Sequence, residues 1–174
     1  MKVENKYKLE KIVSKDTTRH AITCAYLDTK DKTPRLIATN GHAMAVIKVE
    51  AEKDEQGNVP IAAIIDARKL NSKKAIASTL SLNGDCKLDN GATYKRQDSQ
   101  FPDWRKIGTT GDKTFRVAFD AKLLHELADS LGSFKGVVSL EFFGDLKGPI
   151  KVHAWDASGA DHENFGLLMP CTER

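Results

Sequence analysis

Val117-Ala118-Phe119-Asp120-Ala121-Lys122-Leu123-Leu124 repeats the pattern of Ala63-Ile64-Ile65-Asp66-Ala67-Arg68-Lys69-Leu70. Each copy has an apolar strand end, then Asp-Ala, then a basic residue, and later a leucine. Each aspartate is a typical helix N-cap, which predicts helices over residues 66–77 and 120–131, the second closed by Gly132. In the second helix, leucines at 123, 124, 127 and 131 share one face and are expected in the core. Three strand-like segments follow each helix, so both copies predict a βαβββ unit.

Short apolar segments bounded by turn signals make up the rest of the chain. Strands are expected at 6–10, 21–27, 36–39, 43–49, 79–82, 86–88, 92–96, 137–143, 150–155 and 165–169. Asn-Gly dipeptides at 40–41, 83–84 and 90–91 favour tight turns between antiparallel strands. Residues 51–58 are polar and predict an exposed loop, and residues 108–113 predict a linker. The expected fold class is α+β, with antiparallel sheets and a few helices packed on one face.

Composition limits the classes of protein that this chain can be. Its 174 residues are 40% hydrophobic and 29% charged, which is typical of a folded globular protein. No apolar run is long enough to cross a bilayer, and the first residues are too polar for a signal peptide, so a cytoplasmic protein is expected. The three cysteines are far apart and lack a CxxC spacing, which argues against a disulfide framework or a zinc site.

Charge is distributed unevenly along the chain. Residues 1–107 carry 20 Lys and Arg against 14 Asp and Glu, whereas residues 108–174 carry 7 against 10. One basic face is one interpretation, and ordinary surface charge is the other. Charge alone does not predict nucleic-acid binding; if duplex DNA is bound, the expected contacts are sequence-independent, between Lys or Arg side chains and phosphates. The candidates for DNA contact lie on the first predicted helix: Arg68, Lys69, Lys73 and Lys74.

Three short sequence motifs resemble those of a known family. Arg35-Leu36-Ile37-Ala38-Thr39-Asn40-Gly41-His42-Ala43-Met44-Ala45 looks like the "L-x-A-T-D-G-H-R-L-A" hairpin of the bacterial DNA polymerase III beta subunit, the sliding clamp. Phe101-Pro102-Asp103-Trp104-Arg105-Lys106-Ile107 is similar to the family's "F-P-D/N-Y-R-R-V". Phe165-Gly166-Leu167-Leu168-Met169-Pro170-Cys171 is similar to its ending, "Y-V-L-M-P-M-R-L". The motifs occur in the family's order, with the repeat among them.

The resemblance implies a reduced clamp. Residues 1–107 resemble the middle domain with its first helix reduced, and residues 108–174 resemble the second half of the C-terminal domain. Family clamps are non-catalytic ring dimers of three-domain subunits that encircle duplex DNA. A chain this short needs more copies to close a ring, so a homo-oligomer is one expectation. The alternative is a non-ring interaction module, from a phage or mobile element, that competes for clamp partners.

The resemblance also implies a peptide-binding pocket, which in the family captures short linear motifs of polymerases, the clamp loader and repair proteins. The residues that match its motifs are Ile22, Thr39, Gly41, His42, Ala43, Met44, Pro102, Lys106, Ile107, Leu167, Met169, Pro170 and Cys171. Asn40, Ala43 and Cys171 replace the family's Asp, Arg and Met, which implies an altered partner preference. The same strands are also explained as parts of the sheet core.

A search for catalytic motifs finds almost nothing. GxSxG, P-loop and zincin patterns are absent. A polar cluster of His153, Asp156, Asp161, His162 and Glu163 is the one candidate for a hydrolase or metal site, although a solvated hairpin loop explains it better. No enzyme activity, cofactor or metal is therefore expected, and the hydrolase is kept as a lesser alternative.

Overall fold

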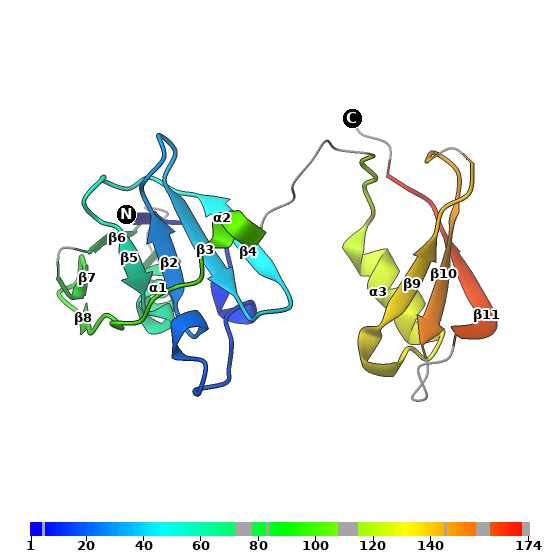
Figure 1. Ribbon diagram of the computed structural model, residues 1–174, viewed down its shortest axis with the longest axis horizontal. Coiled ribbons are helices and arrows are strands. Elements are labelled where there is room, and N and C mark those ends of the chain that lie inside the picture. The colour runs from blue at the N-terminus through cyan, green and yellow to red at the C-terminus, as the bar shows by residue number, and fades with distance from the viewer. Residues whose placement is uncertain are drawn as a thin grey trace. The chain divides into compact units, whose positions relative to one another are not determined.

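The computed structural model describes residues 1–4, 6–71, 78–82, 84–107, 115–144, 146–155 and 161–171. It does not describe the side chains of residues 3, 71, 78, 134 and 161–163. The chain divides into two compact units, Met1–Thr109 and Thr110–Arg174 (Figure 1). Residues 108–114, which include the predicted linker, lie outside the described part, so each unit is treated by itself.

The first unit contains two four-stranded antiparallel sheets (Figure 1). One sheet has the strand order β4-β3-β2-β5 and the other has the order β1-β6-β7-β8. The strands are β1 (Lys2–Val3), β2 (Ala25–Asp28), β3 (Arg35–Thr39), β4 (Met44–Lys48), β5 (Gly57–Val59), β6 (Ser78–Ser81), β7 (Cys86–Leu88) and β8 (Thr93–Tyr94). The helices are η1 (Leu9–Lys11), η2 (His20–Ile22), α1 (Ile61–Asn71) and α2 (Trp104–Ile107), of which η1 and η2 are single 3-10 turns.

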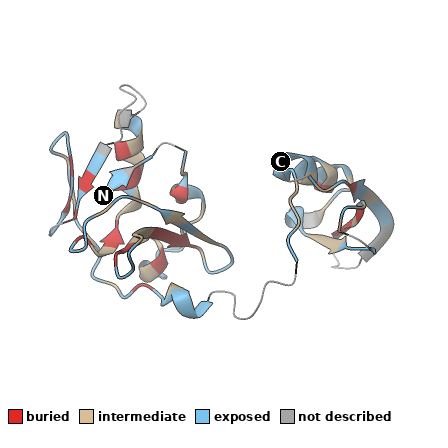
Figure 2. Cartoon of the chain, turned by 90° about the horizontal axis from the view of Figure 1, so that it is seen from above, coloured by how far each residue is buried: buried red, intermediate tan, exposed pale blue. Residues whose placement is uncertain are grey.

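Helix α1 and both sheets share the main hydrophobic core. Leu27 and Leu36 of one sheet, Leu80 of the other and Ile64 of α1 are all at most 2% exposed and belong to one cluster. Buried residues accordingly gather on the strands and the helix of this unit (Figure 2). Complete burial of a leucine contributes about 1.5–3 kcal/mol. The two sheets are therefore held together mainly by apolar contacts through the helix.

The second unit is a single helix on a three-stranded antiparallel sheet. It contains α3 (Ala121–Ser130), η3 (Phe134–Gly136), β9 (Val138–Glu141), β10 (Ile150–Trp155) and β11 (Asp161–Leu168), with the sheet order β11-β10-β9. Leu124 and Leu127 of α3 pack against Ile150 and Val152. Gly166 permits this approach, because a Cβ there would lie 2.5 Å from a methyl group of Leu127. One face of the sheet is thus covered by the helix.

The structure confirms the expected fold class, because its sheets are antiparallel and its helices are few. The second predicted helix is confirmed with its caps. The Asp120 carboxylate accepts from the amides of Lys122 at 2.8 Å and Leu123 at 3.3 Å, and Gly132 has φ +70°. The stripe of leucines is confirmed only in part, because Leu123 is 52% exposed.

The predicted start of the first helix is wrong. Helix α1 begins at Ile61, so Ile64 and Ile65 belong to the helix and not to a strand end. The Pro60 carbonyl accepts from the amides of Ala63 and Ile64, and a proline at a helix start sacrifices no hydrogen bond. Asp66 does not cap the helix; its carboxylate accepts from the Tyr94 hydroxyl at 2.6 Å and from Lys69.

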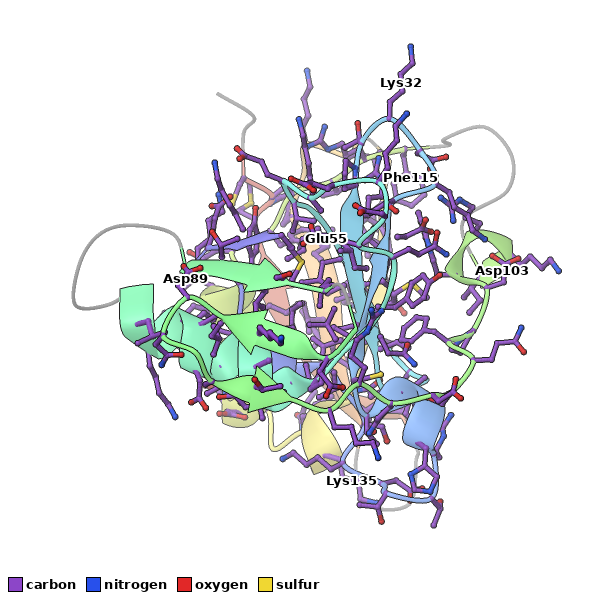
Figure 3. All side chains as sticks on the ribbon, turned by 90° about the vertical axis from the view of Figure 1, so that its left-hand side faces the viewer. Lys32, Glu55, Asp89, Asp103, Phe115 and Lys135 are labelled. Carbon is purple, nitrogen blue, oxygen red and sulfur yellow. The ribbon has the colours of Figure 1, made fainter. Side chains whose placement is uncertain are left out.

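Three further segments differ from expectation. Residues 6–10 form no strand, because Leu9 turns into the core and the Ile12 amide donates to the Leu9 carbonyl. Residues 115–120 form no strand before α3, so the second repeat shows only the order αβββ. The 51–58 loop is not wholly exposed, because the buried Glu55 accepts from the Met1 ammonium at 2.7 Å (Figure 3).

Candidate functional site

Local hydrogen bonds hold the β3–β4 turn of the candidate site in one conformation. Gly41 has φ +91°, a conformation that favours glycine. The Asn40 side-chain oxygen accepts from the amides of His42 at 2.9 Å and Ala43 at 2.8 Å. The Thr39 hydroxyl donates to the Ala43 carbonyl at 2.8 Å and accepts from the Gly41 amide at 3.1 Å. These bonds fix the turn, and with it the side chains on both of its flanks.

A cavity of about 270 Å³ opens beside this turn. Three segments far apart in sequence build it: residues 19–22, 39–44 and 102–107. Its lining residues are Arg19, Ile22, Thr39, Gly41, His42, Ala43, Met44, Pro102 and Ile107. Every residue that the sequence proposed for the pocket from the first unit is present except Lys106. The cavity combines an apolar interior with a polar, cationic rim.

The interior of the cavity is continuous with a small second core. Ile22 is buried and shares a cluster with Ile37 and Phe101, against which Met44 packs. Ile107, in contrast, is 63% exposed. The cavity therefore has a buried apolar floor and an exposed apolar wall. Binding of another apolar group against this wall is favourable, because it removes apolar surface from water.

Helix α2 carries Ile107, and a buried carboxylate holds this helix in place. Asp28, at the end of β2, is 2% exposed. Its Oδ2 accepts from Trp104 Nε1 at 2.8 Å and from Arg105, whose other nitrogen reaches Asp31 at 2.8 Å. The Arg105 guanidinium also lies 4.8 Å from the Trp104 ring centroid. Four polar side chains therefore fix the short helix against the sheet.

Opposing influences act on the pKa of Asp28. Burial alone would raise it, because a carboxylate loses hydration inside the protein. The hydrogen bonds from Arg105, Trp104 and the Lys30 amide together outweigh burial and lower the pKa below the ordinary value of an aspartate. The pKa of Arg105 is raised, first by its hydrogen bond to Asp28 and then by its bond to Asp31. Both groups are therefore charged at neutral pH.

Arg19 is a lining residue that the sequence analysis did not single out. Its Nη1 donates to the Asn40 carbonyl at 3.3 Å, and a Cβ on Gly41 would lie 2.6 Å from its Nη2. The guanidinium therefore crosses the turn at the rim of the cavity. The one sequence signal for Arg19 is its spacing of three residues from Ile22. In the structure the Ile22 amide donates to the Arg19 carbonyl, and this turn brings both residues to the same side.

Of the proposed pocket residues in the first unit, Lys106 alone does not line the cavity; it is exposed and pairs with Asp103 at 3.7 Å. Four more proposed residues, Leu167, Met169, Pro170 and Cys171, lie on or just after β11 in the second unit. Leu167 and Met169 are 61% and 60% exposed, Cys171 is exposed, and Pro170 is half-buried.

Two of the four candidates for DNA contact lie in the described part of α1, and both are paired with carboxylates. Arg68 donates to Glu10 at 2.6 Å, and Lys69 to Asp66 at 2.7 Å. Lys73 and Lys74 lie outside the described residues. The described half of the proposed contact surface is thus already paired with carboxylates.

The polar cluster proposed for a hydrolase or metal site is only partly described. His153 is buried on β10, with Nε2 3.4 Å from a carboxylate oxygen of Glu141. Asp156 and the side chains of residues 161–163 lie outside the described part. Among the side chains that the structure does describe, no group of three or more His, Cys, Asp or Glu is arranged to hold a metal ion.

None of the described helices is both long and apolar enough to span a bilayer.

Known proteins resemble this chain in structure, but none matches it in sequence. No family model matches this sequence. No curated protein matches it significantly either. Solved structures, however, match most of the chain. The Caulobacter crescentus beta sliding clamp, with polyethylene glycol bound to its putative beta-motif tethering region, has a TM-score of 0.71 at 20% identity, over 92% of this chain and 46% of that chain.

Two Pseudomonas aeruginosa structures agree with this match. The DNA polymerase III subunit beta has a TM-score of 0.71 at 19% identity, over 99% of this chain and 52% of that one. A sliding clamp bound to griselimycin has a TM-score of 0.67 at 16% identity, over 99% and 50%. This chain has a sliding-clamp fold. It spans about half the length of the solved clamps that it matches, as the resemblance to a reduced clamp implied.

Proposed function

We propose that this protein is a non-catalytic, clamp-like binding protein that captures short linear peptides of replication and repair proteins. The observation that carries the proposal is the cavity beside the β3–β4 turn. It unites three distant segments, and its lining includes eight residues proposed from sequence. A cavity of about 270 Å³ lies near the lower limit of small-ligand pockets, so it suits one anchoring side chain better than a whole peptide.

The chemistry of the lining defines the peptide. Ile22, Met44 and Ile107 offer apolar contacts, which favour a leucine-like or aromatic anchor. Arg19 and His42 lie at the same cavity, and an arginine favours a carboxylate or carbonyl next to the anchor. Leu167 and Met169 of the second unit are also part of the proposal, because both are exposed apolar side chains.

Two of the similar structures lend support by what they hold. One Pseudomonas aeruginosa clamp is bound to griselimycin, and the Caulobacter crescentus clamp has polyethylene glycol at a putative beta-motif tethering region. Those are properties of those proteins. They support the proposal, because two proteins with this fold bind other molecules.

Fluorescence anisotropy with a labelled clamp-binding pentapeptide tests the proposal. Ile107→Asp should weaken binding at least tenfold, because a loss of about 1.4 kcal/mol of apolar contact already gives that factor. Val46→Asp is the matched control, since Val46 is also an exposed apolar side chain but does not line the cavity. Equal weakening by both variants, or no saturable binding by the unaltered protein, would contradict the proposal.

A non-ring interaction module with the same cavity is the second candidate. It is favoured by the pairing of Arg68 with Glu10 and of Lys69 with Asp66, since these two residues are the described candidates for contact with DNA. DNA contact through α1 is not part of the proposal, because Arg68 and Lys69 are paired. Salt-dependent binding of duplex DNA that is lost in Lys69→Glu would reinstate the clamp-like contact and argue against the module.

A further inference from the structure

The first unit is built from two half-units that exchange their first strands. The first half consists of β1, the turns η1 and η2, and β2–β4. The second half consists of β5, α1 and β6–β8. Strand β1 pairs with β6 of the second half, and β5 pairs with β2 of the first half, both antiparallel. Each half thereby adds a fourth strand to the three-stranded sheet of the other.

The second unit matches one half-unit only. Helix α3 and strands β9–β11 follow in the order of α1 and β6–β8. Pro60 and Asp120 occupy equivalent positions, because each carbonyl accepts from the amide four residues later. Strand β9 is therefore the equivalent of β6. Within the described residues, no strand pairs with the edge of β9 that faces away from β10.

Residues 115–119 directly precede α3 in the chain, just as β5 directly precedes α1. Residues 115–119 have the strand-like sequence Phe-Arg-Val-Ala-Phe but form no strand. In the first unit, the side chain of Arg96, just after the last strand, donates to the Asn58 carbonyl of β5 at 3.0 Å. In the second unit, the Cys171 amide, just after its last strand, donates to the Ala118 carbonyl at 2.8 Å. One edge of each segment is bound by its own half. Among the strands that the structure describes, one pairs with the other edge of β5, and none pairs with residues 115–119.

The second unit also leaves much of its apolar surface exposed. Among the described residues, the large apolar side chains that are exposed all lie in this unit except Val46 and Ile107. They include Phe115, Leu123, Val137 and Phe143. The third residue of each helix makes the contrast direct: Ala63 of α1 is 0% exposed, and Leu123 of α3 is 52% exposed. The half-unit lacks the cover that its counterpart receives.

We propose that a second copy of this chain supplies the missing half. Two second units form a two-fold symmetric pair in which residues 115–119 of each copy add a fourth strand to β9 of the other. A copy of this chain is the occupant because the chain already builds a complete unit by this reciprocal exchange. Each copy also carries both the segment that would be added and the edge that would accept it, as a self-complementary interface requires. The residues that line the cavity belong to the first unit, whereas residues 115–119 and β9 belong to the second, so this interface does not require that the cavity binds a peptide.

The backbone identifies the groups that take part. The Trp155 amide donates to the Val137 carbonyl, so the alternation of an antiparallel pair directs the amides of Val138 and Leu140 to the open edge. The Ala118 carbonyl is directed at Cys171, which leaves the peptide groups of Val117 and Phe119 facing the other way. These amides and carbonyls are the hydrogen-bonding groups of the new strand pair.

Sedimentation equilibrium of the full chain over a concentration series tests the proposal. The unaltered protein should approach twice the 19.2 kDa mass of one chain. Val117→Pro removes an amide that faces the partner and should give the mass of one chain, with circular dichroism confirming that it folds. Val117→Ala keeps the amide and should remain a dimer. A monomeric unaltered protein, or an oligomer that Val117→Pro leaves intact, overturns the proposal; the second result points to another edge or partner.

Hydrogen exchange provides a test that needs no variant. As the protein concentration rises through the association range, the amides of Val138 and Leu140 should become protected, while the exposed β3–β4 turn should not change. Failure of these two amides to gain protection while the mass doubles shows a different interface. Peptide anisotropy measured on Val117→Pro keeps the two proposals apart, because its binding should equal that of the unaltered protein.

Discussion

Replacing Asp28 should destabilise the first unit more than its single carboxylate suggests. In Asp28→Ala, the Trp104 indole and the Arg105 guanidinium both lose an acceptor, and so does the Lys30 amide. A hydrogen bond to a charged group contributes about 1.5–3 kcal/mol. The loss is less than additive, because Arg105 keeps Asp31 and the buried carboxylate no longer has to be dehydrated. We expect a net loss of about 2 kcal/mol in the free energy of unfolding.

Two further variants separate charge from geometry. Asp28→Asn keeps an acceptor for the indole and should lose about 1 kcal/mol, the share of the ionic interaction with Arg105. Asp31→Ala removes the exposed partner of the same guanidinium and should lose less than about 0.5 kcal/mol. Urea unfolding followed by Trp104 fluorescence, in a Trp155→Phe background, measures all three. If Asp28→Ala loses no more than Asp31→Ala, the assignment of Asp28 as the anchor of α2 is wrong.

The pH dependence of this loss follows from the lowered pKa of Asp28. A carboxyl whose folded pKa lies below its unfolded value, about 3.9, contributes stability that is present above the unfolded pKa. That contribution is lost as the pH falls through the folded pKa. The difference between unaltered protein and Asp28→Asn should therefore be constant near neutrality and shrink below about pH 4. A difference that grows on acidification would contradict the ionised state of Asp28.

Three further outcomes are expected. Asp120→Ala removes the N-cap of α3 and should lower the stability of the second unit by about 1 kcal/mol in urea unfolding followed by Trp155 fluorescence in a Trp104→Phe background. With a thiol reagent, the exposed Cys171 should react first, since burial removes Cys24 and Cys86 from the solvent and raises the pKa of each to about 11. Gly41→Ala should lose about 1–2 kcal/mol, because of its φ of +91° and the guanidinium that crosses the turn, and should weaken peptide anisotropy.

Local chemistry made much of the fold predictable. The Asp120 cap, the Gly132 termination and the Asn40-Gly41 turn each depend on groups within a few residues, so the sequence contains the whole cause. The first helix was misplaced because Asp66 resembles a cap locally. Its carboxylate instead accepts from Tyr94, 28 residues away, which only the tertiary structure reveals.

In the candidate site, too, the residues with local contacts were predicted from the sequence and the residues with remote contacts were not. The motif at residues 35–45 predicted the β3–β4 turn correctly, because Thr39, Asn40 and Gly41 form their hydrogen bonds within the turn itself. Arg19 and Asp28 were missed because their contacts are remote: Arg19 reaches Asn40 across 21 residues, and Asp28 reaches Trp104 across 76. Residues that shape a site through such contacts leave no periodic or local pattern in the sequence.

The small core of the second unit links its stability to its assembly. Among the side chains described in this unit, the buried apolar cluster consists of Ile150, Val152 and Leu168, and a domain of about 60 residues is marginally stable by itself. Because association favours the folded state by mass action, the unfolding temperature of this unit should rise with protein concentration. That of the first unit, which buries its own halves, should not. Trp155 fluorescence in a Trp104→Phe background reports the second unit, and Trp104 reports the first. Concentration-independent unfolding at Trp155 would show that the half-unit is stable without a partner, and the exposed face would then need another explanation.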